Sequence, residues 1–321
     1  MMIFSWRKRT VVTIATCLMF VGAPGTTPTA NPFDPETRAS FSASDRYDAV
    51  LLHLRKGEWK KLLWEGEMLL QDFPDSTYAQ EARYYMGIAL FENADYAMAR
   101  RRFSEYLQGN SSPRFFEEAI RYEFRIAQRL REGARRRLFG ARGMPKWVHG
   151  YEDAVEIFDE VIAAFPRSDL AAESLHGKAS LLAELKEYEK SIEAYRTLIR
   201  RFPIHTLAPE SYLGIADVYL LKFRKAPSSH HSIDAAEINV RKFRAHFPGE
   251  PRLKGAEQKL AEMRNIMAAD LLETGDFYKK THHPEAAVVY YRTVLRKYPD
   301  TKAAERARKE VATSKEQGSR A

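Results

Sequence analysis

One short segment of this chain occurs twice, almost letter for letter. The residues from Tyr195 to Pro203 read YRTLIRRFP, and those from Tyr291 to Pro299 read YRTVLRKYP. Internal similarity of this kind is typical of stacked repeat proteins, in which each unit packs only on its neighbours. We therefore expect an elongated array rather than one closed core, and we expect its function to lie on the surface of the repeats.

Aromatic–proline dipeptides mark the expected ends of helices, because proline commonly follows a helix C-terminus. They are Phe73-Pro74, Phe165-Pro166, Phe202-Pro203, Phe247-Pro248 and Tyr298-Pro299. The residues eight and thirteen positions after each proline are small, as is required where two helices cross closely. At position eight they are Ala82, Ser174, Ser211, Ala256 and Ala307, and at position thirteen Gly87, Ala179, Ala216, Ala261 and Ala312.

A small residue twelve positions before the proline and a large one eight positions before it lie one helical turn apart on one face. These pairs are Ala154 and Phe158, Ser191 and Tyr195, Ala236 and Val240, and Ala287 and Tyr291. The pattern resembles the tetratricopeptide repeat, a helix–turn–helix unit of 34 residues. We expect an all-α solenoid of about five such units, with a further degenerate copy through Tyr96, Ala99 and Phe103.

A basic insertion widens the spacing between the second and third repeats. Its glycines and Pro145 predict a loop or a broken helix that projects from the array. As a docking patch it would take an acidic partner or anionic lipid head groups; the alternative is a solvated insertion without a partner. The candidate docking residues are Arg135, Arg136, Arg137, Arg142 and Lys146.

The N-terminus has the features of an export signal. Arg7, Lys8 and Arg9 precede an apolar run over residues 11–23 that is too short to span a bilayer. Cys17, the single cysteine of the chain, lies in a segment that resembles a bacterial lipobox, although Thr16 stands where Gly, Ala or Ser is usual. Cys17 is therefore either the lipidated first residue of the mature protein or part of a signal that is cleaved later.

The expected organisation has six segments. They are an export signal over 1–30, a linker over 31–42, N-terminal repeats over 43–128, the basic insertion over 129–150, C-terminal repeats over 151–313 and a flexible tail over 314–321.

No motif for catalysis or cofactor binding is present in the sequence. The adjacent pairs His230-His231 and His282-His283 lie in predicted turns and lack the spacing of a metal site. The net charge of +8 arises from 51 basic and 43 acidic residues distributed along the chain, which does not favour nucleic acid as a partner. We predict a protein that is not an enzyme and that needs neither a metal nor another cofactor.

The pattern F/Y-P-x-S/T-x-x-A recurs over residues 73–79, 165–171 and 298–304 of an expected exported array. In this combination the chain resembles the BamD family (YfiO family), lipoproteins of the machinery that assembles β-barrels in the Gram-negative outer membrane, over about residues 40–313. The resemblance implies a scaffold at the periplasmic face of the outer membrane, held there by a lipid anchor or by a partner. It also implies binding to a BamA-like barrel-inserting protein, to other subunits and to unfolded outer-membrane protein clients, with the N-terminal repeats capturing clients and the C-terminal repeats docking.

A second function fits the same fold: a general periplasmic tetratricopeptide adaptor for envelope or cell-division complexes. Co-purification of a BamA-like barrel protein would distinguish the two functions.

The first helix of each tetratricopeptide unit lines a groove, and apolar side chains there would suit a client segment with aromatic residues. Counting from Gly87 and from the matching position of the first unit, the candidate groove residues are Tyr47, Tyr84, Ile88 and Phe91. The alternative is that these side chains only contact the neighbouring helix.

Overall fold

The computed structural model describes residues 41–109, 112–137, 146–225 and 230–318. Residues 43–321 form one compact unit and residues 1–42 another, of which only the last two residues are described. The predicted export signal, Cys17 and most of the predicted linker therefore lie outside the described residues. Within the described ranges, no helix combines the length and apolar character needed to cross a bilayer.

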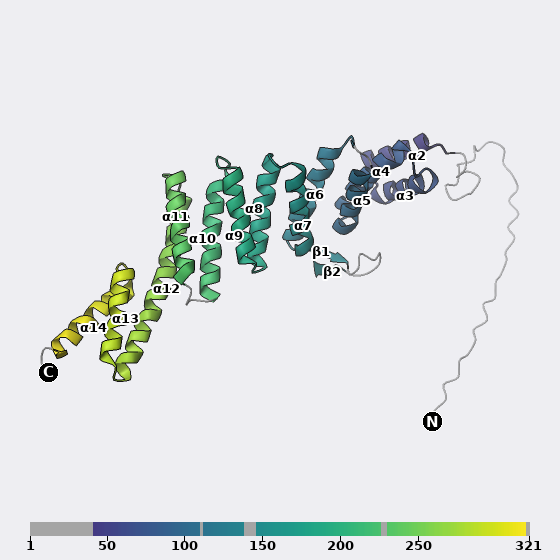
Figure 1. The fold of residues 1–321 in the computed structure, drawn as a ribbon. Helices are drawn as coiled ribbons and strands as arrows, with labels where there is room; N and C mark the ends of the chain where they lie inside the picture. The colour runs from purple at the N-terminus through teal and green to yellow at the C-terminus, as the bar shows by residue number, and fades with distance from the viewer. Residues whose placement is uncertain (1–40, 110–111, 138–145, 226–229, 319–321) are drawn as a thin grey trace, which may run out of the picture. The chain divides into compact units, whose positions relative to one another are not determined.

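Thirteen helices and one two-stranded hairpin make up the described part of the chain (Figure 1). The helices are α2 (Ala43–Lys56), α3 (Trp59–Asp72), α4 (Thr77–Glu92), α5 (Tyr96–Gln108), α6 (Phe116–Arg131), α7 (Tyr151–Ala164), α8 (Asp169–Glu184), α9 (Tyr188–Arg201), α10 (Leu207–Lys225), α11 (His230–His246), α12 (Arg252–Lys280), α13 (Pro284–Lys297) and α14 (Lys302–Gly318). They form six consecutive helix pairs, α2/α3 to α12/α13, followed by α14.

Each helix packs on the next one along the chain, and the first helix of each pair also contacts the first helix of the following pair. This double contact is the arrangement of a tetratricopeptide solenoid, so the predicted all-α fold is confirmed. The six pairs correspond to the five aromatic–proline units and the degenerate copy, whose residues Tyr96, Ala99 and Phe103 lie on α5.

In the pairs α2/α3, α4/α5, α8/α9 and α12/α13, the turn between the two helices contains one residue in the left-handed region. The four residues at this position are Gly57 (φ 67°), Ala94 (φ 53°), Lys186 (φ 64°) and His282 (φ 61°). At each of these four turns, two backbone N–H groups donate to carbonyls of the first helix, for example from Lys186 to Ala183 (3.0 Å) and from Glu187 to Leu182 (2.9 Å). The change in chain direction therefore depends on backbone geometry rather than on one residue type. For this reason the four turns share no residue type at this position.

Between pairs, the aromatic–proline motif ends one helix and begins the next. Phe73 and Phe165 are the C-terminal caps of α3 and α7. Two residues after the proline, the hydroxyls of Ser76 and Ser168 accept hydrogen bonds from the backbone N–H groups three residues later, at 3.0 and 3.2 Å. Such caps satisfy N–H groups that have no partner within the helix, which explains the S/T of the motif.

The small residues of the repeat signature lie in the core. All five at the eighth position after proline are fully buried. A Cβ added at Gly87 would come within 2.7 Å of the Phe103 ring, and one added at Gly214 within 2.6 Å of the Tyr195 ring, so larger side chains would push these helices apart. The large residues eight positions before proline, such as Phe158 and Tyr291, are buried as well.

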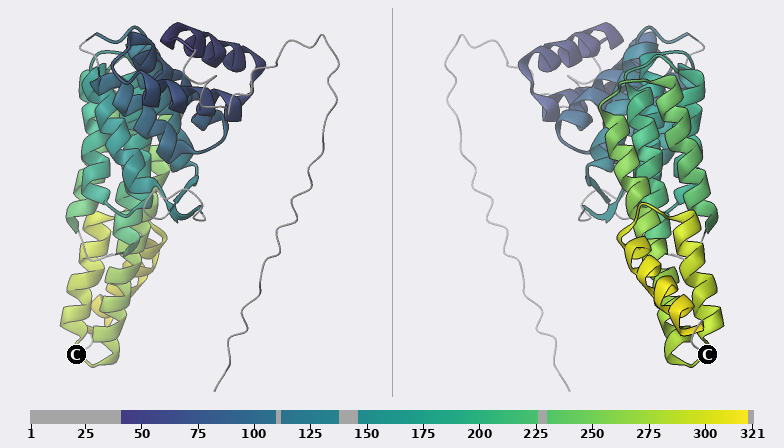
Figure 2. Two further views of the ribbon diagram at one scale, coloured as in Figure 1. Left: turned by 90° about the vertical axis from the view of Figure 1, so that its right-hand side faces the viewer. Right: turned by 90° about the vertical axis from the view of Figure 1, so that its left-hand side faces the viewer.

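The thirteenth position departs from this rule at the C-terminal end, where Ala261 and Ala312 are exposed. The reason is the 29-residue helix α12, which contacts α10 and α11 as well as α13 and α14. Both views of Figure 2 show α13 and α14 beside the end of α12 that lies away from α11. The close crossing in this pair has moved to Gly275, where an added Cβ would lie 2.6 Å from Tyr291.

The basic insertion contains a β-hairpin, which the prediction of a loop or broken helix missed. Helix α6 runs on to Arg131, and Gly133 (φ 92°) follows its end. Strand β1 (Arg135–Arg137) then pairs antiparallel with β2 (Lys146–His149), with a register shift after Arg136. Trp147 and Val148 favour a strand, and glycines separate the two segments, but the run of arginines obscured this signal.

Two further predictions are corrected. His230 and His231 begin α11 rather than lying in a turn. Helix α14 continues to Gly318, so residues 314–318 are helical where we expected a flexible tail. The residues before Gly318 are mostly good helix formers, and the glycine lies at the point where the helix ends.

Candidate functional site

The residues predicted to line a groove divide into two kinds. Tyr84 and Phe91 are each only 6% exposed and belong to the core that α4, α5 and α6 share. The Tyr84 ring stacks on Phe115 at 4.6 Å, and the Phe91 ring lies 5.4 Å from Tyr122. These two side chains therefore contact a neighbouring helix, which was the alternative interpretation, and they are not available to a ligand. Tyr47 and Ile88 are half-buried and reach the surface.

A group of partly exposed aromatic side chains does lie on this part of the array. It includes Tyr85, the residue next to the predicted Tyr84. We call Tyr47, Tyr78, Tyr85 and Phe115 the aromatic surface. Tyr47 of α2 has its ring centroid 4.9 Å from that of Tyr78 and 6.2 Å from that of Tyr85, both on α4. Tyr85 in turn lies 5.7 Å from Phe115, which precedes α6. Three successive first helices or their N-terminal caps thus contribute to one surface.

Local polar groups hold the aromatic surface in place. The Tyr47 hydroxyl donates a hydrogen bond to Glu81, and burial together with this carboxylate raises the pKa of the tyrosine. Glu81 also lies 3.8 Å from the guanidinium of Arg114, which sits 5.0 Å from the centre of the Phe115 ring. Tyr47 and Phe115 are therefore oriented before any ligand arrives, which lowers the entropy cost of binding to them.

Sequence reasoning missed Tyr78, Tyr85 and Phe115, although signals for them existed. Residues 78, 81, 85 and 88 follow a three- and four-residue step along one helix face, whereas 84 and 91 follow another. Choosing Tyr84 instead of its neighbour Tyr85 rotates the assignment by about 100° around the helix. Tyr78 lies within the repeated F-P-x-S/T-x-x-A motif itself.

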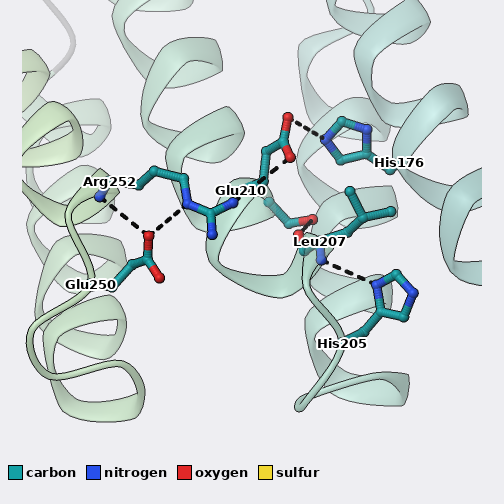
Figure 3. Close-up of polar contacts among 7 residues, drawn as sticks. His176, His205, Leu207, Glu210, Glu250 and Arg252 are labelled. Atoms are coloured by element: carbon teal, nitrogen blue, oxygen red, sulfur yellow. Dashed lines mark hydrogen bonds and ion pairs between the residues drawn. The ribbon is translucent and has the colours of Figure 1, made fainter.

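A second polar feature connects the first helices of three later pairs (Figure 3). Glu210 of α10 lies 3.8 Å from the His176 imidazole of α8 and 3.8 Å from the Arg252 guanidinium of α12. Arg252 also donates to Glu250 at 2.7 Å. Burial lowers the pKa of His176 more than the nearby Glu210 raises it. This network ties successive units together, so we assign it to the stability of the array rather than to a ligand.

Glu123 of α6 is the most strongly perturbed carboxyl group in the described part of the chain. It is 2% exposed, and burial, reinforced by the nearby Glu160, raises its pKa to about 7. The positive charge of Arg100 on α5 partly opposes this shift, and the same guanidinium pairs with Glu156 at 3.1 Å and Glu160 at 2.9 Å, both on α7. Glu123 therefore lies where the second and third helix pairs meet.

The predicted basic docking patch is described in part. Arg135, Arg136 and Arg137 form β1 and Lys146 begins β2, so their backbones lie on the two paired strands. Arg142 lies outside the described residues. Within the described residues, no cluster of three or more His, Cys, Asp or Glu side chains could hold a metal ion.

Comparison with known proteins gives one match to a family. Residues 141–318 match the model of the YfiO family, described as outer membrane lipoprotein. The matched region covers more than half of the chain and begins after the aromatic surface. No curated protein sequence matches the chain.

Solved tetratricopeptide structures resemble the chain in fold only. A tetratricopeptide repeat protein from Parabacteroides merdae shares 11% identity over 85% of this chain and 98% of its own, with a TM-score of 0.37. The C-terminal part of a repeat protein from Cytophaga hutchinsonii shares 12% over 85% and 90%, with a TM-score of 0.39. YrrB, described as having an unusual peptide-binding site, shares 12% over 68% and 92%, with a TM-score of 0.38.

Proposed function

The chain belongs to the YfiO family of outer membrane lipoproteins, and from this premise we propose that it is a non-enzymatic scaffold of the outer-membrane β-barrel assembly machinery. In this role it acts at the periplasmic face of the outer membrane, binds the barrel-inserting subunit and receives unfolded barrel proteins. The membership itself supports a tetratricopeptide protein of the cell envelope, a class in which binding to other proteins is the usual activity. What we propose beyond this class is the role in barrel assembly and the binding of unfolded barrel proteins.

The aromatic surface is the observation that supports client binding most directly. Tyr78 is 38% exposed, and Tyr47, Tyr85 and Phe115 are half-buried, so the four rings together offer apolar area to a ligand. An aromatic side chain buries on the order of 150–250 Å² when it is covered completely. At about 25 cal/mol per Å², covering the exposed parts of several rings would contribute a few kcal/mol. Barrel strands alternate apolar and polar side chains and carry aromatic residues near the membrane interfaces, so their apolar face fits such a surface.

The sixth helix pair supports a separate docking site for the barrel-inserting subunit. Phe277 of α12 is 61% exposed and Val289 of α13 is 63% exposed, which is unusual for large apolar side chains on packed helices. We assign docking to this pair, and we keep the hairpin β1–β2 as an additional basic contact for an acidic partner or anionic lipid. Membrane attachment through Cys17 belongs to the same proposal.

Photocrosslinking tests the client site. The probe is a synthetic peptide that copies the C-terminal strand of an outer-membrane barrel and carries a photoreactive group. We expect the double substitution Tyr78→Ser with Tyr85→Ser to reduce crosslinking at least about tenfold, since two ring contacts are lost. The matched control is Phe277→Ser with Val289→Ser, which removes two exposed apolar side chains elsewhere. Equal crosslinking by both double variants would refute the assignment.

Affinity purification from detergent-solubilised envelopes tests the assembly role. We expect the unaltered chain and the Tyr78/Tyr85 variant to bring down a BamA-like barrel protein, and the Phe277/Val289 variant to lose it. Recovery of envelope or cell-division proteins without any barrel protein would instead favour the general periplasmic adaptor.

A further inference from the structure

The array carries several clefts at equivalent positions. Each lies between the second helices of two consecutive pairs and above the first helix of the later pair. One of about 690 Å³ lies between α3 and α5, one of about 620 Å³ between α7 and α9, and one of about 450 Å³ between α9 and α11. A smaller one of about 280 Å³ lies between α11 and the turn before α14. Because these clefts share one backbone geometry, differences between them come from side chains alone.

Three of these clefts mix charges of both signs. The α3/α5 cleft contains Glu67 and Glu105 together with Arg83 and Arg102. The cleft before α14 contains Glu257 and Asp300 together with Arg244 and Arg264. The α7/α9 cleft contains Glu152, Asp159, Glu187 and Glu193 together with Lys178, Lys190 and Arg201. Mixed clefts of this kind satisfy their own charges, as the pair of Lys178 with Asp159 (2.6 Å) illustrates.

The α9/α11 cleft differs, and we call it the cationic cleft. Arg196 and Arg200 of α9 line one wall, and Lys242 and His246 of α11 line the other; no Asp or Glu is among its lining residues in the part of the chain that the structure describes. Among those residues, neither Arg196 nor Lys242 has a carboxylate within ion-pair distance. Arg196 donates instead to the Tyr219 hydroxyl at 2.9 Å, and Arg200 reaches the exposed Glu193 at 3.4 Å.

The floor of the cationic cleft is apolar. Ile199 and Ile215 lie in it together with Ala235, and Ile238 is 49% exposed. The floor is held rigid from below, because Tyr212 stacks on Phe243 at 5.1 Å and shares a hydrogen bond with His246 at 2.7 Å. Asn239 adds a hydrogen bond from its side-chain amide to the Tyr212 carbonyl at 2.9 Å. An apolar floor between two positive walls is complementary to a segment with apolar residues in the middle and carboxylates on both sides.

We propose that the cationic cleft binds an acidic amphipathic segment of another protein, with an aliphatic or aromatic side chain on the isoleucine floor and carboxylates against Arg196, Arg200 and Lys242. This contact is separate from client capture at the aromatic surface and from docking at the sixth pair, and it does not depend on either. A membrane surface fits less well, because the cationic cleft is a groove between α9 and α11 with Ile215 of α10 at its base, a shape that admits a chain segment better than a flat layer of head groups.

Fluorescence anisotropy of the purified chain tests the proposal. The probe is a labelled amphipathic peptide with leucines along one helical face and glutamates on both flanks. One comparison peptide has lysine in place of glutamate, and another has serine in place of leucine. The test variant is Arg200→Glu with Lys242→Glu, which reverses one exposed charge on each wall. The matched control is Lys190→Glu with Lys254→Glu, two exposed lysines outside the cationic cleft.

We expect the acidic peptide alone to bind the unaltered chain, with at least a tenfold loss in the Arg200/Lys242 variant and little change in the control. Ile238→Ser should weaken binding several-fold without altering the helical circular dichroism spectrum, since this side chain is half exposed. Equal losses in the test and control variants would contradict the proposal, as would binding of the serine-substituted peptide with undiminished affinity. If the Arg200/Lys242 variant loses sedimentation with phosphatidylglycerol vesicles while no peptide binds, the cleft is a lipid site and the proposal is wrong.

Discussion

The aromatic surface and the cationic cleft lie on the same type of scaffold yet present opposite chemistry. The first uses first helices, with Tyr47 on α2 and Tyr78 and Tyr85 on α4. The second uses second helices, with Arg200 on α9 and Lys242 on α11. Their backbones follow the same helix–turn–helix rule, so the difference lies in residues outside the repeat signature. The comparison teaches that in this protein the repeat fixes where surfaces form, whereas the variable positions decide what each surface can bind.

The helix pairs that carry the aromatic surface provide the largest expected effect, through the buried Glu123 of α6. Glu123 has a pKa of about 7 in the folded chain, against 4.5 for an ordinary glutamate, so between these values the folded state binds more protons than the unfolded state. The contribution of Glu123 to the free energy of unfolding is close to zero below about pH 4.5 and becomes increasingly destabilising as the pH rises to about 7. We expect Glu123→Gln to raise the free energy of unfolding by about 3 kcal/mol at pH 8 and to leave it nearly unchanged at pH 4.

Urea denaturation at both pH values measures this effect, with the exposed Glu118→Gln on the same helix as control. If Glu123→Gln raises the free energy of unfolding equally at pH 4 and pH 8, ionisation of the carboxyl group is not the cause of the stabilisation. If one unfolding transition becomes two, the two regions fold as separate units, as stacked repeats can.

Two glycines allow each region to be disturbed by itself. An alanine at Gly87 would press on Phe103 beneath the aromatic surface, and one at Gly214 would press on Tyr195 beside the cationic cleft. We expect each substitution to lower the free energy of unfolding by about 1–3 kcal/mol, because these interfaces are closely packed. Gly87→Ala should weaken client crosslinking only, and Gly214→Ala should weaken binding of the acidic peptide only. Gly255→Ala is the control, since its nearest neighbour is a flexible leucine methyl at 3.2 Å.

Salt should separate the two surfaces without any substitution. Binding of the acidic peptide depends on exposed charges that salt screens, whereas contact with the aromatic surface depends on apolar area. Raising the NaCl concentration from about 50 to about 300 mM should weaken binding of the acidic peptide roughly tenfold and leave client crosslinking nearly constant. If salt lowers peptide binding and client crosslinking to the same extent, the two surfaces do not differ in the kind of interaction they use.

The turns within the pairs give the smallest expected effect. Lys186, in the turn between α8 and α9, has φ 64°, and Gly57, in the first pair, has φ 67°. Lys186→Gly should stabilise the chain by up to about 1 kcal/mol, and Gly57→Ala should destabilise it by about 1 kcal/mol, because only glycine adopts this region without strain. Thermal unfolding of the two variants measures both changes. Destabilisation by Lys186→Gly would mean that the lysine side chain contributes more than its backbone strain costs.

Much of the fold could be predicted because the repeat is a local rule. Phe165 and Pro166 end a helix, Ser168 caps the next one, and Ala171 packs inside; each step depends on residues within a few positions of one another. The hairpin β1–β2 was missed because its pairing joins residues 9 to 14 positions apart across a segment whose glycines and Pro145 indicated a loop. Likewise, the extent of α12 depends on the four helices that pack along it, α10, α11, α13 and α14.

By itself, the sequence determined the class of fold, the caps and crossings of its units and the resemblance to an envelope protein family, because periodicity and capping are properties of nearby residues. Only the tertiary structure decided which side chains are available for binding. Tyr84 is buried and Tyr85 half exposed although they are neighbours in the chain, since the packing of α6 covers one helix face and leaves the other open. The cationic cleft is likewise a tertiary property, because its two walls come from helices separated in sequence by all of α10.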